Sequence, residues 1–252
     1  DVEAALAQPT GIVSVMLANN KTGVIQDVAA VAETARRQKA WVHTDAVQAF
    51  GKIKVDFTAL NVHAMTISAH KIYGPKGAAA LILDKRLELK PLLSGGGHEK
   101  GMRSGTENVP AIVGFGVACE LAQSRLQNLS SELQAMRERL EQGLQGMDAR
   151  VFGSNAQRLP NTSYFAFPGI DGETLVIELD KAGYAVASGS ACTSVSNDPS
   201  PTLLAMGVAP DVAKSAVRVS LGKANKMHEI EDFLQTLNAV LNRLKRLSAI
   251  AV

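Results

Sequence analysis

The chain has 252 residues, 46% of them hydrophobic, and a formal net charge of +2, which allows a substantial core in one large or two modest domains. Because 26 basic residues nearly balance 24 acidic ones, there is no electrostatic case for binding nucleic acid or an acidic membrane surface. No run approaches the roughly 20 apolar residues of a membrane span and no secretory signal opens the chain, so we expect a cytoplasmic protein.

The first half of the chain alternates predicted strands and helices. Residues 12–17 form an apolar, β-branched run that predicts a buried strand, and a polar turn follows at residues 19–23. Asp27 can cap an amphipathic helix that runs to about Lys39. Further strands are predicted at residues 41–44, 64–68 and 78–83. This alternation predicts an α/β sheet of largely parallel strands.

Polar residues follow three of these strands directly. Asn19 and Asn20 follow the first strand, Asp45 follows the second, and His70 and Lys71 follow the third. Ligands of parallel α/β sheets bind just beyond the carboxyl ends of the strands. We therefore expect these polar residues to converge on one edge of the sheet.

A second domain is predicted after a long helix. The chain becomes helical from Asn108, and the charged, Gln-rich pattern of residues 124–144 is typical of a long exposed helix. The domain boundary is placed near Gln123, which gives domains of residues 1–123 and 124–252. The second domain is predicted to be small and α+β, with strands at residues 162–167, 185–187 and 216–220 and helices at residues 172–182 and 228–247.

Lys71 is placed unusually for a lysine, because it closes a buried strand together with Ser68 and His70 in the segment SAHK. Most lysines keep the protein soluble at its surface. A partly desolvated lysine loses proton affinity and becomes the amine nucleophile of Schiff-base chemistry, which pyridoxal 5'-phosphate uses. Such a site also needs a carboxylate on the pyridinium nitrogen of the cofactor. Asp45 in the segment HTDAVQ is positioned for that role, although a helix N-cap is the alternative for this residue.

The chain's two cysteines, Cys119 and Cys192, have no CxxC spacing and predict neither a disulfide framework nor a metal site. Cys192 lies in a small, polar tract, SGSACTSVSNDP at residues 188–199, which can hardly bury a thiol and could carry it to and from a cofactor. A small buried apolar side chain is the alternative for any isolated cysteine. Cys119 lies in a predicted helix and receives that second interpretation.

Four segments together resemble the cysteine desulfurase family, in its NifS/IscS-like branch. They are HTDAVQ (residues 43–48), SAHK (residues 68–71), RSGTEN (residues 103–108) and SGSACTS (residues 188–194), and the resemblance runs through essentially the whole chain. It implies the fold-type I architecture of pyridoxal-phosphate-dependent transferases, an α/β large domain followed by a small α+β C-terminal domain.

The resemblance also implies roles for individual residues. Lys71 would carry the cofactor as a Schiff base, Asp45 would pair with its ring nitrogen and Gln48 would hydrogen-bond its phenolic oxygen. The remaining implied cofactor contacts are Ser68 and His70 at the phosphate, Thr106 at the phosphate of the neighbouring subunit, and Asn20. Asn20 and Arg218 would hold the substrate carboxylate, a task that suits guanidinium geometry. The implied catalytic residues are Lys71, Cys192 and His70.

The implied activity is a sulfurtransferase that converts L-cysteine to L-alanine and leaves a persulfide on Cys192. The length of the loop after that residue is similar to the branch that supplies iron–sulfur cluster assembly and tRNA thiolation. The expected partners are therefore L-cysteine, a sulfur-acceptor or scaffold protein and a second copy of the chain in a homodimer. Two alternatives stay open, a catalytically silent fragment acting as an interaction module and a selenocysteine lyase or aminotransferase of the same fold.

The sequence departs from the family pattern in three places. Lys21 stands where the resemblance leads us to expect glutamate, and His98 where we expect glutamine. The chain also begins with Asp1, and the segment that carries a Gly/Thr phosphate-binding turn and a ring-stacking histidine in the family has no counterpart here. We therefore expect a fragment with an incomplete cofactor pocket, and weak or absent cofactor binding by this chain alone.

Overall fold

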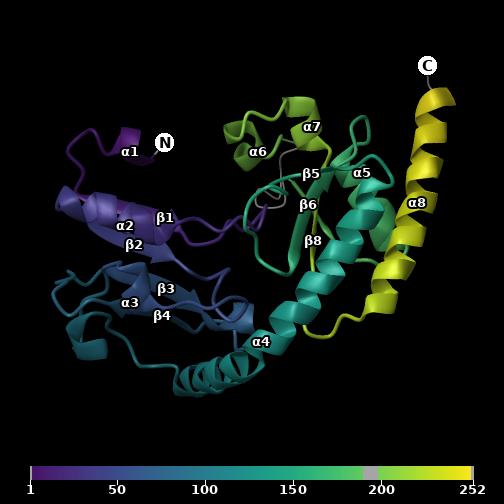
Figure 1. The fold of residues 1–252 in the computed structure, drawn as a ribbon. Coiled ribbons are helices and arrows are strands. Elements are labelled where there is room, and N and C mark those ends of the chain that lie inside the picture. Colours follow the sequence, from purple (N-terminus) through teal and green to yellow (C-terminus); the bar gives the residue numbers. More distant parts are fainter. Residues whose placement is uncertain (1, 190–197, 251–252) are drawn as a thin grey trace. The chain divides into compact units, whose positions relative to one another are not determined.

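The computed structural model describes residues 2–189 and 198–250, and its chain divides into two compact units (Figure 1). The first comprises Asp1–Ala18 and Gln26–Gln127, and the second comprises Asn19–Ile25 and Asn128–Val252. The domain boundary predicted near Gln123 falls inside one continuous helix, α4, which runs from Val109 to Gln145. The polar turn predicted at residues 19–23 lies in the segment Asn19–Ile25, which groups with the second unit and not with the first.

The first unit is built on a four-stranded sheet with the order β1-β2-β3-β4. Strands β1, β2 and β3 are parallel, and β4 runs antiparallel to β3. Their bounds are Ile12–Met16, Trp41–Asp45, Ala64–Ser68 and Ala79–Leu83. This confirms the predicted α/β sheet of largely parallel strands, and it places the ends of β2 and β3 side by side because Asp45 is in register with Thr66.

The expectation of a fully buried first strand is wrong, since the side chain of Ile12 is 65% exposed. Among the described strands β1 has one neighbour, β2, and therefore lies at an edge of the sheet. Burial begins only beyond the strand, at Leu17, which is 4% exposed. An apolar run predicts a strand from its side-chain types, but its burial depends on what covers it.

Short helices connect these strands and turn the chain back towards the sheet. Asp27 caps α2 as predicted, because its side chain accepts a hydrogen bond from the Ala30 amide. This helix buries Val28, Ala32 and Ala35. The helices of the first unit, besides the beginning of α4, are α1 (Val2–Ala5), α2 (Val28–Arg37), α3 (Phe57–Leu60), η1 (Ala69–Ile72) and η2 (Glu99–Gly101).

The second unit contains an antiparallel sheet in the order β5-β6-β8-β7. The strands are β5 (Arg150–Val151), β6 (Thr162–Ala166), β7 (Ala187–Ser188) and β8 (Ala216–Ser220). The helices, besides the end of α4, are α5 (Gly172–Lys181), α6 (Pro201–Ala205), α7 (Pro210–Lys214) and α8 (Met227–Ile250). The strand predicted at residues 185–187 differs from β7, which comprises only Ala187 and Ser188. These are the two residues that pair with β8.

The two faces of this second sheet pack against different helices. On one face Phe165, Val217 and Val219 join a core cluster that includes residues of α4, α5 and α8. On the other face Tyr164 and Ala216 join a smaller cluster with residues of α6 and α7. Alternation along β6 and β8 produces this division, since successive side chains of a strand point to opposite faces. Within the described part of the chain, no helix is long and apolar enough to cross a membrane.

Candidate active site

Asp45 is the last residue of β2, and its side chain is half-buried. One carboxylate oxygen accepts a hydrogen bond of 2.8 Å from the Val47 amide and so closes the turn that follows the strand. The alternative of a helix N-cap is wrong in this form, because the oxygen caps a turn and the next helix begins only at Phe57. The same turn holds Gln48, which is also half-buried. A carboxylate fixed in this way is presented at the carboxyl end of a parallel strand.

His43 lies two residues before Asp45 and therefore on the same face of the sheet. Its two ring nitrogens pair with the hydroxyls of Ser14 and Thr66, each at 2.8 Å. Burial lowers the pKa of His43 below its ordinary value, and the nearby Asp45 carboxylate opposes that shift. The hydrogen bonds of His43 thus join β2 to β1 and β3 beside the Asp45 carboxylate.

Ser68 ends β3, and the turn η1 follows with His70 and Lys71. The Ser68 hydroxyl and the His70 Nδ1 are 2.7 Å apart. Ala69 and Ile72 are buried and anchor the turn, which leaves the side chains of His70 and Lys71 exposed. The expectation that Lys71 is partly desolvated is therefore not met in this chain.

The structure brings Asp45 and Ser68 of the first unit together on one face. Asp45 is in register with Thr66, and Ser68 lies two residues further along β3, so Asp45 and Ser68 point to the same side of the sheet. His70 and Lys71 come directly after Ser68. The carboxylate and the residues that follow β3 thus share one edge, as predicted for two of the three polar strand ends.

Lys52 is a neighbour of this site that sequence reasoning missed. Its ammonium donates a hydrogen bond of 2.7 Å to the carbonyl oxygen of Gln48. Burial, and then the positive charge of Lys71, lower the pKa of Lys52 to about 8. The chain therefore places a second, more buried amine beside Lys71. A motif search could not find it, because the lowered pKa depends on burial by residues distant in sequence.

The second unit holds Asn20 and Arg218, the residues predicted to bind the substrate carboxylate. Arg218 donates from Nη1 to the backbone oxygen of Asn20 at 2.8 Å, so the two are in direct contact. Both side chains are half-buried. The Nε atom of Arg218 is buried and has no hydrogen-bond partner among the described residues. Part of the guanidinium thus keeps donor capacity for an anionic ligand.

Two further predicted residues are placed less closely. Thr106 is exposed in the segment between η2 and α4 of the first unit. Cys192 lies outside the described residues. Cys119 is half-buried within α4, and burial raises the pKa of its thiol, which fits the interpretation of a packed side chain.

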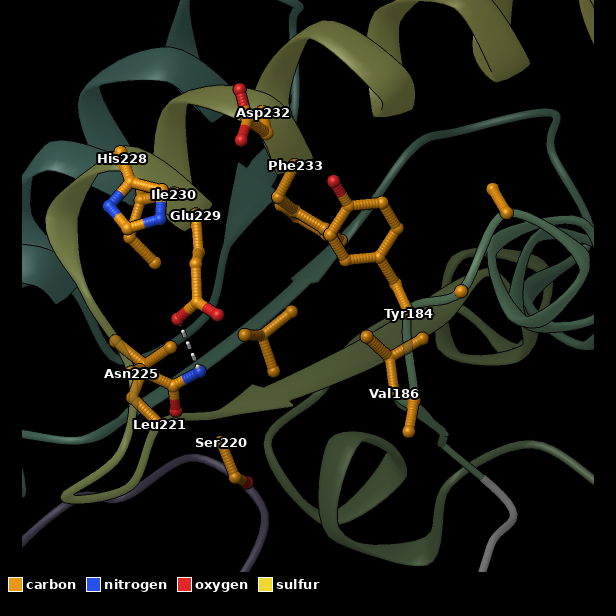
Figure 2. A pocket seen from close by; sticks show the side chains of 14 residues that line it. Tyr184, Val186, Ser220, Leu221, Asn225, His228, Glu229, Ile230, Asp232 and Phe233 are labelled. Atoms are coloured by element: carbon orange, nitrogen blue, oxygen red, sulfur yellow. Dashed lines mark hydrogen bonds between the residues drawn. The ribbon is translucent and has the colours of Figure 1, made fainter.

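A groove of about 680 Å³ lies elsewhere in the second unit, beside the start of α8 (Figure 2). None of the predicted site residues lines it. Its Glu229 carboxylate accepts hydrogen bonds from the Lys226 amide and the Asn225 side chain, which caps the helix and lowers the pKa of Glu229. The floor is formed by core residues, including Phe233, which packs edge-on against Tyr184. Helix capping and core packing account for these residues.

Comparison with known proteins shows an extended similarity. The family described as Aminotransferase class-V matches residues 1–233. A curated "Cysteine desulfurase" of Gluconacetobacter diazotrophicus is 42% identical over 253 residues, which cover 98% of this chain and 63% of the relative. A "Cysteine desulfurase IscS" of Clostridium botulinum is 38% identical over 98% of this chain and 64% of the relative. The chain thus spans less than two thirds of the length of these relatives.

Among solved structures, the chain is similar to a NifS-like protein from Rickettsia africae, with a TM-score of 0.89 and 36% identity over 96% of this chain. That alignment covers 66% of the Rickettsia chain. A second solved structure, also described as a NifS-like protein, has a TM-score of 0.88 at 36% identity. The similarity therefore extends over the described fold of both units.

Proposed function

The chain belongs to the class-V aminotransferase family, and on that premise we propose that it is the desulfurating part of a pyridoxal-phosphate-dependent cysteine desulfurase. The proposed reaction converts L-cysteine to L-alanine and passes the sulfur to an acceptor protein. Curated relatives that carry the name cysteine desulfurase, at 38% to 42% identity, support this activity.

One observation carries the proposal. Asp45 and Ser68 end adjacent parallel strands on one face of the sheet, and Lys71 follows within three residues of Ser68. This combines a carboxylate, a hydroxyl–imidazole pair and an amine at the edge where α/β sheets bind their ligands. Few other cofactors call for that set of groups.

The donor set fits pyridoxal phosphate. The Ser68 hydroxyl and the His70 ring already lie 2.7 Å apart and suit a phosphate, while Asp45 suits a pyridinium nitrogen and Gln48 a phenolic oxygen. Lys71 supplies the amine that attaches the cofactor. When bound, the cofactor withdraws electrons from the substrate's α-carbon.

The chain's own residues would then perform the proton and sulfur transfers. Arg218 and Asn20 orient the substrate carboxylate, and Lys71 removes the proton from the α-carbon. The Cys192 thiolate attacks the substrate sulfur and forms a sulfur–sulfur bond. The electron pair of the broken carbon–sulfur bond stays on the β-carbon, which takes up a proton and becomes the methyl group of alanine. Lys71 would return a proton to the α-carbon, which completes alanine.

We further propose a cytoplasmic homodimer that serves iron–sulfur cluster assembly or tRNA thiolation. Support for the dimer comes from an exposed apolar row on α4, called here the α4 row, in which the side chains are 48% to 60% exposed. Its members recur every four residues and therefore share one helix face: Val109, Val113, Val117 and Leu121. A second copy would cover this row, and the exposed Thr106 precedes it directly.

The same α4 row favours a second candidate, an interaction module that binds no cofactor. To distinguish the desulfurase from the interaction module, the chain is incubated with pyridoxal phosphate and L-cysteine. Released alanine and the mass of the peptide that contains Cys192 are then measured. Alanine release with a persulfide on Cys192 supports the desulfurase, and Cys192→Ala should abolish the persulfide while the cofactor absorbance persists. An intact fold with no cofactor absorbance and no alanine would support the interaction module.

A further inference from the structure

A buried lysine lies in the turn that the chain contributes to the second unit. This residue, Lys21, is only 6% exposed. A buried ammonium is costly unless it is paired or well hydrogen-bonded. Among the described residues no carboxylate lies within ion-pair distance of Lys21. The position of this charge therefore needs an explanation.

The ammonium of Lys21 donates a hydrogen bond to a backbone carbonyl. Lys21 Nζ donates a hydrogen bond of 3.1 Å to the oxygen of Gly189, and this contact is buried. The amide of Gly189 in turn donates to the Ala216 oxygen at 2.8 Å, which continues the pairing of β7 with β8. Both backbone groups of Gly189 are thus bonded, one to the sheet and the other to Lys21.

Gly189 lies where a side chain could not fit. A Cβ atom there would come within 2.8 Å of the Tyr164 hydroxyl oxygen and 3.2 Å of the Ala213 carbonyl oxygen. The backbone therefore passes closely over the face of the sheet that carries Tyr164 and Ala216. Its path at this point is restricted by packing on one side and by the hydrogen bond from Lys21 on the other.

The turn that carries Lys21 is itself fixed. The Asn19 side-chain oxygen accepts hydrogen bonds of 2.9 Å from the amides of Lys21 and Thr22. The Leu159 amide donates to the Gly23 oxygen at 2.8 Å, and Arg218 donates to Asn20. The ammonium is thus presented from a turn that is bonded to the residues flanking β6 and to β8 itself.

We propose that Lys21 is a positioning residue that holds the carbonyl of Gly189, three residues ahead of Cys192 in the sequence, and so fixes the backbone directly after β7. A charged donor suits this task because its hydrogen bond to a carbonyl is stronger than that of a neutral group. The inference rests on the proposed function for the part that Cys192 plays, and on the Lys21–Gly189 contact for the anchoring itself.

The anchoring is tested by amide hydrogen exchange, which needs no enzyme activity. Methionine matches the length of lysine and fills the buried site without a charge, so Lys21→Met should remain folded. We expect the Gly189 amide to exchange about tenfold faster in this variant, because one of its two anchors is gone. The Phe152 amide, bonded to Tyr164 within the same sheet, should exchange at an unchanged rate.

Two further variants make the result specific. Lys214→Met places the same substitution at an exposed lysine of the same unit and should leave the Gly189 amide unaffected. Lys21→Arg keeps a charged donor and should restore slow exchange. If the Phe152 amide also exchanges faster in Lys21→Met, that variant has lost more of its structure than the bond to Gly189. Lys21→Gln, which keeps a neutral donor, then takes the place of Lys21→Met in the test. Unchanged exchange at Gly189 in the folded variant overturns the inference.

A kinetic measurement tests whether the anchoring serves sulfur transfer. In the cofactor-loaded enzyme Lys21→Met should lower kcat for alanine release about fivefold, with KM for L-cysteine within about twofold, because Asn20 and Arg218 remain. An unchanged kcat despite faster exchange overturns the positioning role. An unsubstituted chain that releases no alanine, but shows the predicted exchange pattern, contradicts the proposed function and leaves the anchoring of Gly189 supported.

Discussion

Two amines lie close together in the first unit, and they differ in burial. Lys71 is exposed, whereas Lys52 is half-buried and donates to the Gln48 oxygen. The charge of Lys71 contributes to the lowered pKa of Lys52, so the two ammonium groups repel each other. Repulsion of this kind favours the loss of one proton from the pair. An amine free of its proton is what attachment to an aldehyde requires.

The pH dependence of stability should report the state of Lys52. Its pKa is lowered to about 8 in the folded chain and stays near 10.5 in the unfolded chain, so the unfolded state binds more protons between these values. The folded state is therefore penalised below pH 8, and the penalty is relieved as the pH rises. Lys52→Met removes this penalty at every pH.

We expect the advantage of Lys52→Met in unfolding free energy to shrink by about 2 kcal/mol between pH 7 and pH 10. The measurement is urea denaturation of both proteins at each pH. Lys76→Met, at an exposed lysine nearby, serves as the control and should show no such trend. An advantage that stays constant with pH would mean that Lys52 is not desolvated.

At the scale of elements, α4 supplies a buried ion pair to the second unit. Arg158 donates through both terminal nitrogens to Glu141, each at 2.7 Å, and the two side chains are only 5% and 12% exposed. Arg137, on the same helix, donates to the Leu159 oxygen, and burial followed by the charge of Arg158 lowers its pKa. Glu141 thus neutralises Arg158 and contributes, together with the more exposed Glu138, to compensating the charge of Arg137.

Removing that carboxylate's charge should be costly. Glu141→Gln should reduce the free energy of unfolding by about 2–4 kcal/mol, because Arg158 would stay buried without a counter-charge and Arg137 would keep only the more exposed Glu138. Glu33→Gln is the matched control, since Glu33 pairs with Arg37 at the surface, where both side chains are about 70% exposed. Its effect should stay below about 0.5 kcal/mol. Equal effects of the two substitutions would contradict this account of the pair.

Elements with strong local signals were predictable from the sequence. The cap at Asp27 and the periodicity after it predict α2, and the β-branched run before Ser68 predicts β3. The two-residue strands β5 and β7 were not identifiable as such, because their pairing depends on neighbours distant in sequence. The short helices α6 and α7 begin at Pro201 and Pro210, a helix-start signal that was overlooked.

The residues of the candidate site were likewise predictable only in part. Asp45 and Lys71 were found because strand ends and residue types are visible in the sequence. His43, Lys52 and Lys21 were not found, because their importance comes from burial and from partners 23 to 168 residues away or from a neighbouring charge. Side chains with tertiary roles of this kind need coordinates.

At the scale of the whole molecule, the proposed dimer would cover the exposed α4 row. Val113→Glu together with Val117→Glu should convert a dimer to a monomer, because two charges would be buried in the interface. Light scattering after size-exclusion chromatography measures the mass. Ile177→Glu, at an exposed apolar residue of α5, is the control and should leave the mass unchanged. A dimer that survives the double substitution would place the interface elsewhere.

The central claim is that Lys71 is the amine that carries the cofactor. Borohydride reduction of the chain with excess pyridoxal phosphate, followed by peptide mass spectrometry, reads the labelled lysine directly. We predict a phosphopyridoxyl group on Lys71 and its loss in Lys71→Ala, with Lys76→Met labelled as before. The excess of pyridoxal phosphate is raised until it overcomes the weak binding expected of this chain alone. A label on Lys52 in place of Lys71 at that excess, or no label at Lys71 in the folded chain, would contradict the account.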